Sequence, residues 1–224
     1  MPLSSARRRW PWLGACCAGL LAALSPSQAW DASLMQAAAL RLGPAAVAAV
    51  TPLQALLTAL RPLDDGERLR QVNQFFNRRI GFRSDLEVWG VEDYWASPLE
   101  TLAKGEGDCE DYAIAKYASL LAAGMTPSRL RLVYVRARLA GAPAAGQPHM
   151  VLAYHASDHG EPLILDNLVA EILPASQRHD LTPVFSFNAE GLWQGVGPAS
   201  AGDPLARLSR WRNVLSKIRE EGFL

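Results

Sequence analysis

The chain has few cysteines and no excess of charge of either sign. Three cysteines occur among 224 residues, and 22 lysines and arginines balance 22 acidic residues. This balance excludes the strongly basic surface that is typical of nucleic-acid-binding proteins. Cys16 and Cys17 lie in an N-terminal stretch that we expect to be removed, which leaves Cys109 without a partner for an intrachain disulfide.

The sequence also lacks an apolar run that would span a membrane comfortably. Residues 10–24 are almost entirely apolar and follow three arginines at positions 7–9, but a spanning helix needs about 20 such residues. Small residues at 25–29 then provide the pattern of a cleavage site. We therefore predict a secretory signal peptide over residues 1–29, with cleavage after Ala29.

A lipoprotein signal is the alternative, because Leu13-Gly14-Ala15-Cys16 resembles a lipobox. The apolar stretch continues past Cys16 instead of ending there, so we favour the ordinary signal peptide. The arginines are also compatible with a twin-arginine signal, although the match is poor.

Removal of the signal peptide leaves one domain, residues 30–224, without internal repeats or a further hydrophobic span. The signal contains three arginines and no acid, so the mature chain has 19 basic and 22 acidic residues. Its length of about 195 residues is sufficient for a sizeable core.

The first half of this domain has helical patterns. Residues 30–60 predict one or two helices, broken at Gly43-Pro44 and Thr51-Pro52, and a further helix begins at Asp64 and ends at Gly81. Residues 82–100 look irregular and rich in aromatic residues. A helix from Asp108 to Gly124 follows, with Asp108 as N-cap and Cys109 in its first turn, where the helix dipole favours a negative group.

The second half changes to strand patterns. We expect strands at 130–135, 149–155, 163–168 and 183–187, a loop at 140–148 and a turn at 156–161. A last helix begins at Asp203-Pro204, and its apolar stripe is expected to dock on the core. Helices followed by antiparallel strands indicate an α+β fold.

Cys109, His149 and Asp166 form a candidate catalytic set. A nucleophilic cysteine needs a base, and the base needs a group that orients it. If 156–161 is the turn of a hairpin, His149 and Asp166 face each other across two strands. Asn167 is the fallback for Asp166, although strand alternation directs it to the other face. His155, His159 and His179 lie in or near turns and loops and have no such pairing.

Three carboxylates, Asp108, Glu110 and Asp111, surround Cys109 in sequence. They should raise the pKa of the thiol by like-charge repulsion. Helix capping explains one or two of them, whereas a bound cation explains all three. Calcium is the cation that such an all-oxygen set suits, and zinc is disfavoured. The residues alone leave capping and calcium both open.

The motif Gly107-Asp108-Cys109-Glu110-Asp111-Tyr112-Ala113 resembles the bacterial transglutaminase-like cysteine proteinases. Supporting matches occur at residues 72–77, 117–120, 130–135, 149–151, 165–167 and 183–188. The resemblance covers residues 64–195, whereas residues 30–60 and the C-terminal helix match nothing known to us. It implies a transglutaminase- or papain-like fold with the cysteine at a helix N-terminus and the histidine and aspartate on an antiparallel sheet.

The resemblance further implies peptide-bond hydrolysis, with Cys109 as nucleophile, His149 as its base and Asp166 orienting the imidazole. It implies Ca²⁺ beside the cysteine, held by Asp108, Glu110 and Asp111. The amide of Cys109 would bind the oxyanion, and we suggest Trp95 as the second donor, although a core role for this aromatic residue is as good an interpretation.

By the same resemblance we expect a periplasmic protease that cuts the N-terminal region of a large surface adhesin within an Ala-Ala pair, and so promotes biofilm dispersal. An inner-membrane cyclic-di-GMP receptor of the LapD type would be its regulator. Other interpretations are transglutaminase-type acyl transfer, a non-catalytic binding domain and cell-wall amidase activity.

Overall fold

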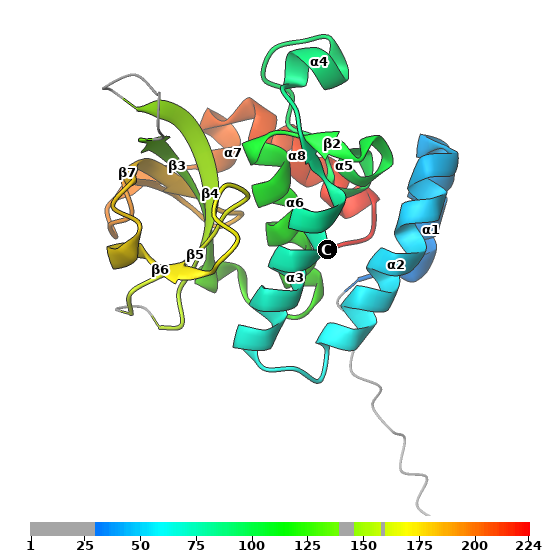
Figure 1. The fold of residues 1–224 in the computed structure, drawn as a ribbon, viewed down its shortest axis with the longest axis horizontal. Coiled ribbons are helices and arrows are strands. Elements are labelled where there is room, and N and C mark those ends of the chain that lie inside the picture. The colour runs from blue at the N-terminus through cyan, green and yellow to red at the C-terminus, as the bar shows by residue number, and fades with distance from the viewer. Residues whose placement is uncertain (1–29, 139–145, 158–159) are drawn as a thin grey trace, which may run out of the picture.

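The computed structural model describes residues 30–138, 146–157 and 160–224. Helices form one half of the molecule and a curved antiparallel sheet forms the other (Figure 1), which confirms the predicted α+β class. The signal peptide, most of the predicted 140–148 loop and the centre of the 156–161 turn lie outside the described residues.

The helices are α1 Ala32–Leu42, α2 Pro44–Leu60, α3 Asp65–Arg79, α4 Asp85–Trp89, α5 Pro98–Lys104, α6 Cys109–Ala122, α7 Pro204–Arg207 and α8 Ser209–Glu220. The main sheet has the order β6-β5-β4-β3-β7-β8-β9. Its strands are β3 Leu130–Ala137, β4 Gln147–Tyr154, β5 Leu163–Leu165, β6 Leu173–Pro174, β7 Leu181–Phe187, β8 Leu192–Gln194 and β9 Ser200–Gly202. Two short strands, β1 Gly81–Phe82 and β2 Glu106–Gly107, pair in parallel.

The break predicted at Thr51-Pro52 is wrong, because α2 continues through Pro52. The break at Gly43-Pro44 is confirmed, with Pro44 at the first position of α2. Proline in a helix interior removes a hydrogen bond, but α2 buries Val50 and Leu53 on either side of Pro52. Packing of that face against the neighbouring helices overrides the local signal.

The region 82–100 is irregular only in part, because it contains α4 and the start of α5, while residues 90–97 between them form no helix or strand. Each helix begins with a capping box, formed by Ser84 with Glu87 and by Ser97 with Glu100. In this motif the serine and the glutamate satisfy amides at the helix start. The spacing was visible in the sequence, but the two helices are too short to show an apolar period.

Helix α6 packs between the other helices and the sheet, against α3 and α5 on one side and β4 and β3 on the other. All residues from Asp111 to Ala122 are buried, so this helix forms the centre of the core. The predicted docking of the C-terminal segment is also confirmed, since Trp211 and Ile218 of α8 are fully buried. Within the described residues, no helix combines the length and the apolar character of a membrane span.

Candidate active site

Cys109 is the first residue of α6, as its sequence predicts. Asp108 is the N-cap, and the Asp111 side chain folds back toward the Asp108 amide in a capping box. A Cβ atom at Gly107 would lie 2.5 Å from the Asp111 carboxylate. Glycine at 107 therefore leaves the space in which this first turn closes over its own start.

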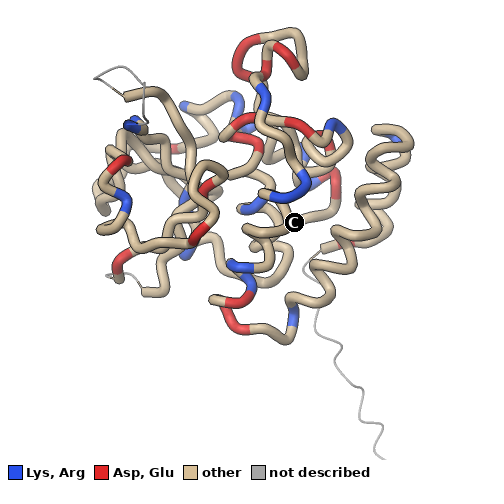
Figure 2. Tube along the Cα trace, viewed as in Figure 1, with Lys and Arg blue, Asp and Glu red and all other residues tan. Residues whose placement is uncertain are grey.

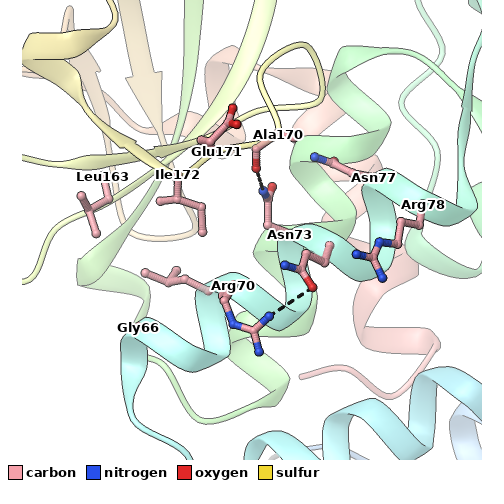
Figure 3. Close-up of a pocket in the computed structure, with 11 residues that line it drawn as sticks. Gly66, Arg70, Asn73, Asn77, Arg78, Leu163, Ala170, Glu171 and Ile172 are labelled. Atoms are coloured by element: carbon pink, nitrogen blue, oxygen red, sulfur yellow. Dashed lines mark hydrogen bonds between the residues drawn. The ribbon is translucent and has the colours of Figure 1, made fainter.

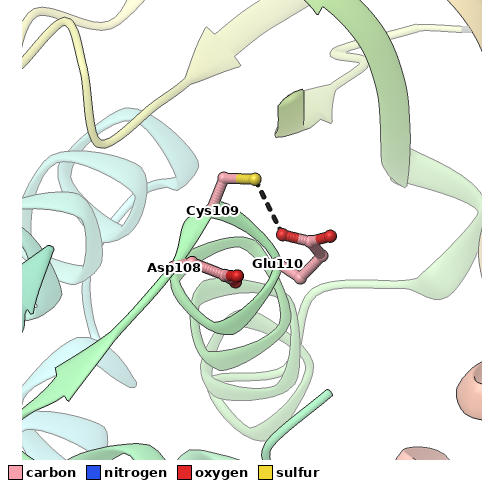
Figure 4. Close-up of side chains that lie close together, drawn as sticks. All are labelled: Asp108, Cys109 and Glu110. Carbon is pink, nitrogen blue, oxygen red and sulfur yellow. Dashed lines mark hydrogen bonds between the residues drawn. The ribbon is translucent and has the colours of Figure 1, made fainter. Parts of the chain in front are cut away.

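The Cys109 thiol donates a hydrogen bond to Glu110 Oε2 at 2.7 Å (Figure 4). Burial raises the pKa of the thiol strongly, and the Glu110 and Asp108 carboxylates raise it further, while the Met150 amide opposes them. The cysteine side chain is half-buried. Without a positive group nearby, this environment keeps the thiol protonated and therefore weakly nucleophilic.

His149 and Asp166 lie in direct contact. His149 Nε2 is 2.8 Å from Asp166 Oδ1, and the two residues are 3% and 1% exposed. Burial would raise the pKa of Asp166, but hydrogen bonds from His149 and Arg178 outweigh it and hold the pKa at about 2. The carboxylate is thus ionised and presents one oxygen to the imidazole.

The register of the hairpin differs from the predicted one by two residues. Leu152 is opposite Leu165 and Tyr154 is opposite Leu163, so an extension of β5 would set Asp166 opposite Val151, diagonal to His149. The strand predicted at 163–168 also ends early, at Leu165. Asp166 Oδ1 accepts a hydrogen bond from the Leu168 amide at 3.1 Å, and this local turn replaces the strand. The two side chains still share a face because a shift of two residues preserves alternation.

Asp166 is also held by residues outside the predicted catalytic set. Arg178 donates to Asp166 Oδ2 at 2.7 Å and also binds Asp180. The Asp166 carbonyl accepts hydrogen bonds from Lys116 Nζ at 3.0 Å and from Asn77 at 2.8 Å. Lys116 is fully buried in α6, and its pKa is lowered to about 7 by burial.

Helix α3 fixes the turn that follows Asp166. One helical turn before Asn77, Asn73 donates to the Ala170 carbonyl at 2.9 Å (Figure 3). A cavity of about 730 Å³ lies beside this contact, between α3 and residues 163–172. Its lining includes none of the three candidate catalytic residues, so we do not assign the chemistry to this cavity.

Cys109 reaches the sheet next to His149. The amide of Met150, the residue that follows His149, lowers the pKa of the thiol, and α6 packs on β4. In the part of the chain that the structure describes, the hydrogen-bond partner of the thiol is Glu110 and not His149. Productive pairing of the thiol and the imidazole therefore requires the cysteine to turn away from Glu110.

A fourth carboxylate joins the acidic group, and the sequence analysis missed it. Oxygen atoms of Asp85, Asp108 and Asp111 lie within 4.8 Å of one another, and so do ligand atoms of Asp108, Cys109 and Glu110. Asp85 comes from α4, on a projecting segment rich in acidic residues (Figure 2). Its contribution depends on tertiary contact and had no signal in the motif around Cys109.

These carboxylates repel one another, and a bound cation would offset that repulsion. Among the described residues, Asp85 Oδ1 and Asp108 Oδ1 are buried without a hydrogen-bond partner. Burial, reinforced by neighbouring acids, raises the pKa of Asp85 to about 6 and that of Asp111 to about 8, and raises that of Asp108 strongly. Oxygen ligands with surplus negative charge are what Ca²⁺ binds.

Trp95 and Asn167 are less well placed for the roles considered for them. The Trp95 indole N–H is 3.1 Å from Asp93 Oδ1, and its ring stacks on Phe187. Asn167 makes no side-chain hydrogen bond to His149 within the described residues, where Asp166 occupies that position. The N–H of Trp95 would have to leave Asp93 before it could meet an oxyanion.

Comparisons with known proteins identify the family of the chain. A family model described as bacterial transglutaminase-like cysteine proteinase matches residues 57–189. The chain belongs to this family. Because the family is one of cysteine proteinases, the chain is a cysteine protease, as the sequence predicts. No curated protein gives a significant match.

Solved structures of LapG from Legionella pneumophila are similar to the chain. The EGTA-treated form is 36% identical with a TM-score of 0.72, covering 84% of this chain and 97% of that one. The calcium-bound form is 35% identical with a TM-score of 0.70, covering 84% and 99%. A relative that binds calcium thus shares the fold in which the acidic group lies.

Proposed function

We propose that the chain is a calcium-dependent endopeptidase of the periplasm in which Cys109, His149 and Asp166 form the catalytic triad. The observation that carries the triad is the buried hydrogen bond between His149 and Asp166, with His149 on the strand against which α6, whose first residue is Cys109, packs. This arrangement supports a triad of nucleophile, base and orienting group at the N-terminus of α6.

His149 takes the proton of the Cys109 thiol and becomes an imidazolium. Cys109 Sγ attacks the scissile carbonyl carbon, and the oxyanion that forms accepts a hydrogen bond from the Cys109 amide at the helix start. The C–N bond then breaks, and the imidazolium of His149 protonates the leaving amine. Water hydrolyses the resulting thioester with His149 as base. Asp166 stays ionised throughout and holds the ring in one orientation, because its pKa of about 2 lies far below neutrality.

We assign a calcium site to Asp108, Glu110 and Asp111, and add Asp85 to the predicted ligands. When bound, the ion supplies a positive charge that offsets these carboxylates and lowers the pKa of the thiol. Glu110 would have a second effect, because a carboxylate that holds the cation would no longer accept the hydrogen bond from the Cys109 thiol. The cysteine side chain would then be free to turn toward His149.

For the substrate, we propose the N-terminal region of a large surface adhesin, cut within an Ala-Ala pair. For the regulator, we propose an inner-membrane cyclic-di-GMP receptor of the LapD type. Membership of the family and similarity to LapG support both proposals. Export through the signal peptide of residues 1–29 would place the protease where such an adhesin is anchored.

The decisive experiment is cleavage of a purified adhesin N-terminal fragment by residues 30–224, with calcium and with a chelator. Cys109→Ala, Asp108→Asn and the control Glu92→Gln, an exposed acid on the α4 segment, are compared with the unaltered chain. We expect that only the unaltered chain and Glu92→Gln cleave the fragment, and that they do so only with calcium. Cleavage in the presence of the chelator would mean that the carboxylates only cap the helix and hold no calcium that activity needs. Cleavage by Cys109→Ala would refute the nucleophile.

A second arm separates hydrolysis from acyl transfer. With an added primary amine, the protease produces a free carboxyl terminus, whereas a transglutaminase-type enzyme produces an amide of the amine at a glutamine. Mass spectrometry of the products distinguishes the two. Full biological activity of Cys109→Ala in cells would instead favour a binding domain.

A further inference from the structure

A row of side chains leads across the sheet from the cysteine to an apolar cavity. Met150 of β4 is opposite Tyr134 of β3, Tyr134 is opposite Phe185 of β7, and Phe185 is opposite Gln194 of β8. Residues directly opposite each other in antiparallel strands point to the same face. The row therefore begins at Met150, the residue after His149 on the strand against which α6 packs, and continues away from α6 on one face.

The middle of this row is aromatic and incompletely buried. The rings of Tyr134 and Phe185 stack with centroids 5.1 Å apart and planes 11° from parallel. Both residues pack against the main core and remain half-buried rather than enclosed. Burial and the charges of Glu110 and Cys109 raise the pKa of Tyr134, which agrees with its place beside the acidic first turn of α6.

The row ends at a cavity of about 340 Å³ between β7, β8, β9 and α7. Its walls include Phe185, Leu192, Ala201 and Leu208, while Gln194 and Arg207 stand at its edge as polar members. This volume is at the low end of about 300–1,000 Å³ for ligand pockets. It is suited to one apolar side chain of an extended polypeptide.

We infer that Tyr134, Phe185 and Gln194, which follow the buried Met150 in this row, line the path of the substrate chain, and that the cavity beside Phe185 binds an apolar side chain of the substrate. The inference rests on the proposed proteolysis at Cys109. Adjacent strands are about 4.8 Å apart, so three steps from β4 to β8 cover roughly 14 Å. An extended chain spans this in about four residues, which places the bound side chain three or four residues from the cleaved bond.

The test uses the adhesin fragment with leucine or glutamate placed in turn at each of the four positions on either side of its cleaved bond. Ala201→Phe fills the cavity from its wall, and Ala199→Phe is the matched control, since Ala199 is exposed and does not line the cavity. Values of kcat/KM are measured for each fragment, and thermal unfolding verifies that both variants fold.

The unaltered protease should prefer leucine over glutamate by about tenfold or more at one position, three or four residues from the bond, as hydrophobic subsites do. Ala201→Phe should lose this preference and Ala199→Phe should keep it. Equal preference in the two variants would overturn the inference while leaving proteolysis intact. Failure of the unaltered chain to cut any fragment would refute the proposed function, and this inference with it.

Discussion

Replacement of Asp85 by asparagine should stabilise the metal-free protein. Asp85 is 4% exposed, and burial raises its pKa to about 6 from an ordinary value of 3.8. The unfolded chain therefore releases this proton more readily than the folded one. The protonated Asp85 side chain contributes its full share to the free energy of unfolding below pH 4. This contribution is lost as the pH rises through 6. About two pKa units correspond to roughly 3 kcal/mol, an upper limit for the loss.

Asparagine preserves the contact that orients the side chain. Asp85 Oδ2 accepts a hydrogen bond from the Tyr94 amide, and Oδ1 is a buried oxygen without a partner. An asparagine oxygen can keep the first bond, while its NH₂ group faces the Asp108 and Asp111 carboxylates. With a chelator at pH 7.5, the free energy of unfolding of Asp85→Asn should exceed that of the unaltered chain by about 1–3 kcal/mol, and Tm should rise by several degrees.

Calorimetry with chelator and with calcium, at pH 4 to 8, measures both effects. The two proteins should converge near pH 4, and Glu92→Gln should stay within about 0.5 kcal/mol of the unaltered chain at every pH. Calcium should raise Tm of the unaltered chain more than that of Asp85→Asn, because a ligand is missing. Lower stability of Asp85→Asn in chelator would refute the electrostatic reasoning, and an equal calcium shift would remove Asp85 from the ligand set.

Three further changes test the site and the core. Asp166→Asn should lower kcat for the adhesin fragment by about 10³-fold or more, since the histidine loses its anionic partner, and a loss below tenfold would contradict that role. Lys116→Met should raise the free energy of unfolding more at pH 6 than at pH 10. The buried amine has a pKa lowered to about 7, so its charge destabilises the folded chain most where the amine is protonated. An equal gain at both pH values in urea titrations would contradict this. Trp211→Ala should reduce stability by about 3–5 kcal/mol, since the fully buried indole also donates to the Asn188 carbonyl, and a change under 1 kcal/mol would mean that the site collapses freely.

Helix starts and the candidate catalytic residues followed from local sequence. The Asp64 side chain caps α3, and Asp108 is the N-cap residue of α6, and capping depends on residues within one turn. The motif around Cys109 and its resemblance to the cysteine proteinases indicated the fold class and the enzyme class correctly. The inferences about helix starts, fold class and enzyme class succeeded because the information lies in short stretches of chain.

The short elements between positions 82 and 107 were missed because their stability comes from contact with distant residues. Ser97 is the N-cap of helix α5, and Glu221 of the C-terminal segment accepts hydrogen bonds from Ser97 and from the Leu99 amide. The break predicted at Pro52 failed for a similar reason. There, a continuous buried face outweighs the proline that local rules treat as an end.

The sequence by itself determined which residue types stand beside Cys109 and where its helix begins, since both depend on neighbours along the chain. Tertiary structure alone brought Asp85 from α4 to Asp108 and Asp111, and set Arg178, Lys116 and Asn77 around Asp166. It also fixed the hairpin register two residues from the predicted one. Alternation reveals which face a strand residue occupies but not its partner, because every even shift satisfies the pattern and only packing selects among them.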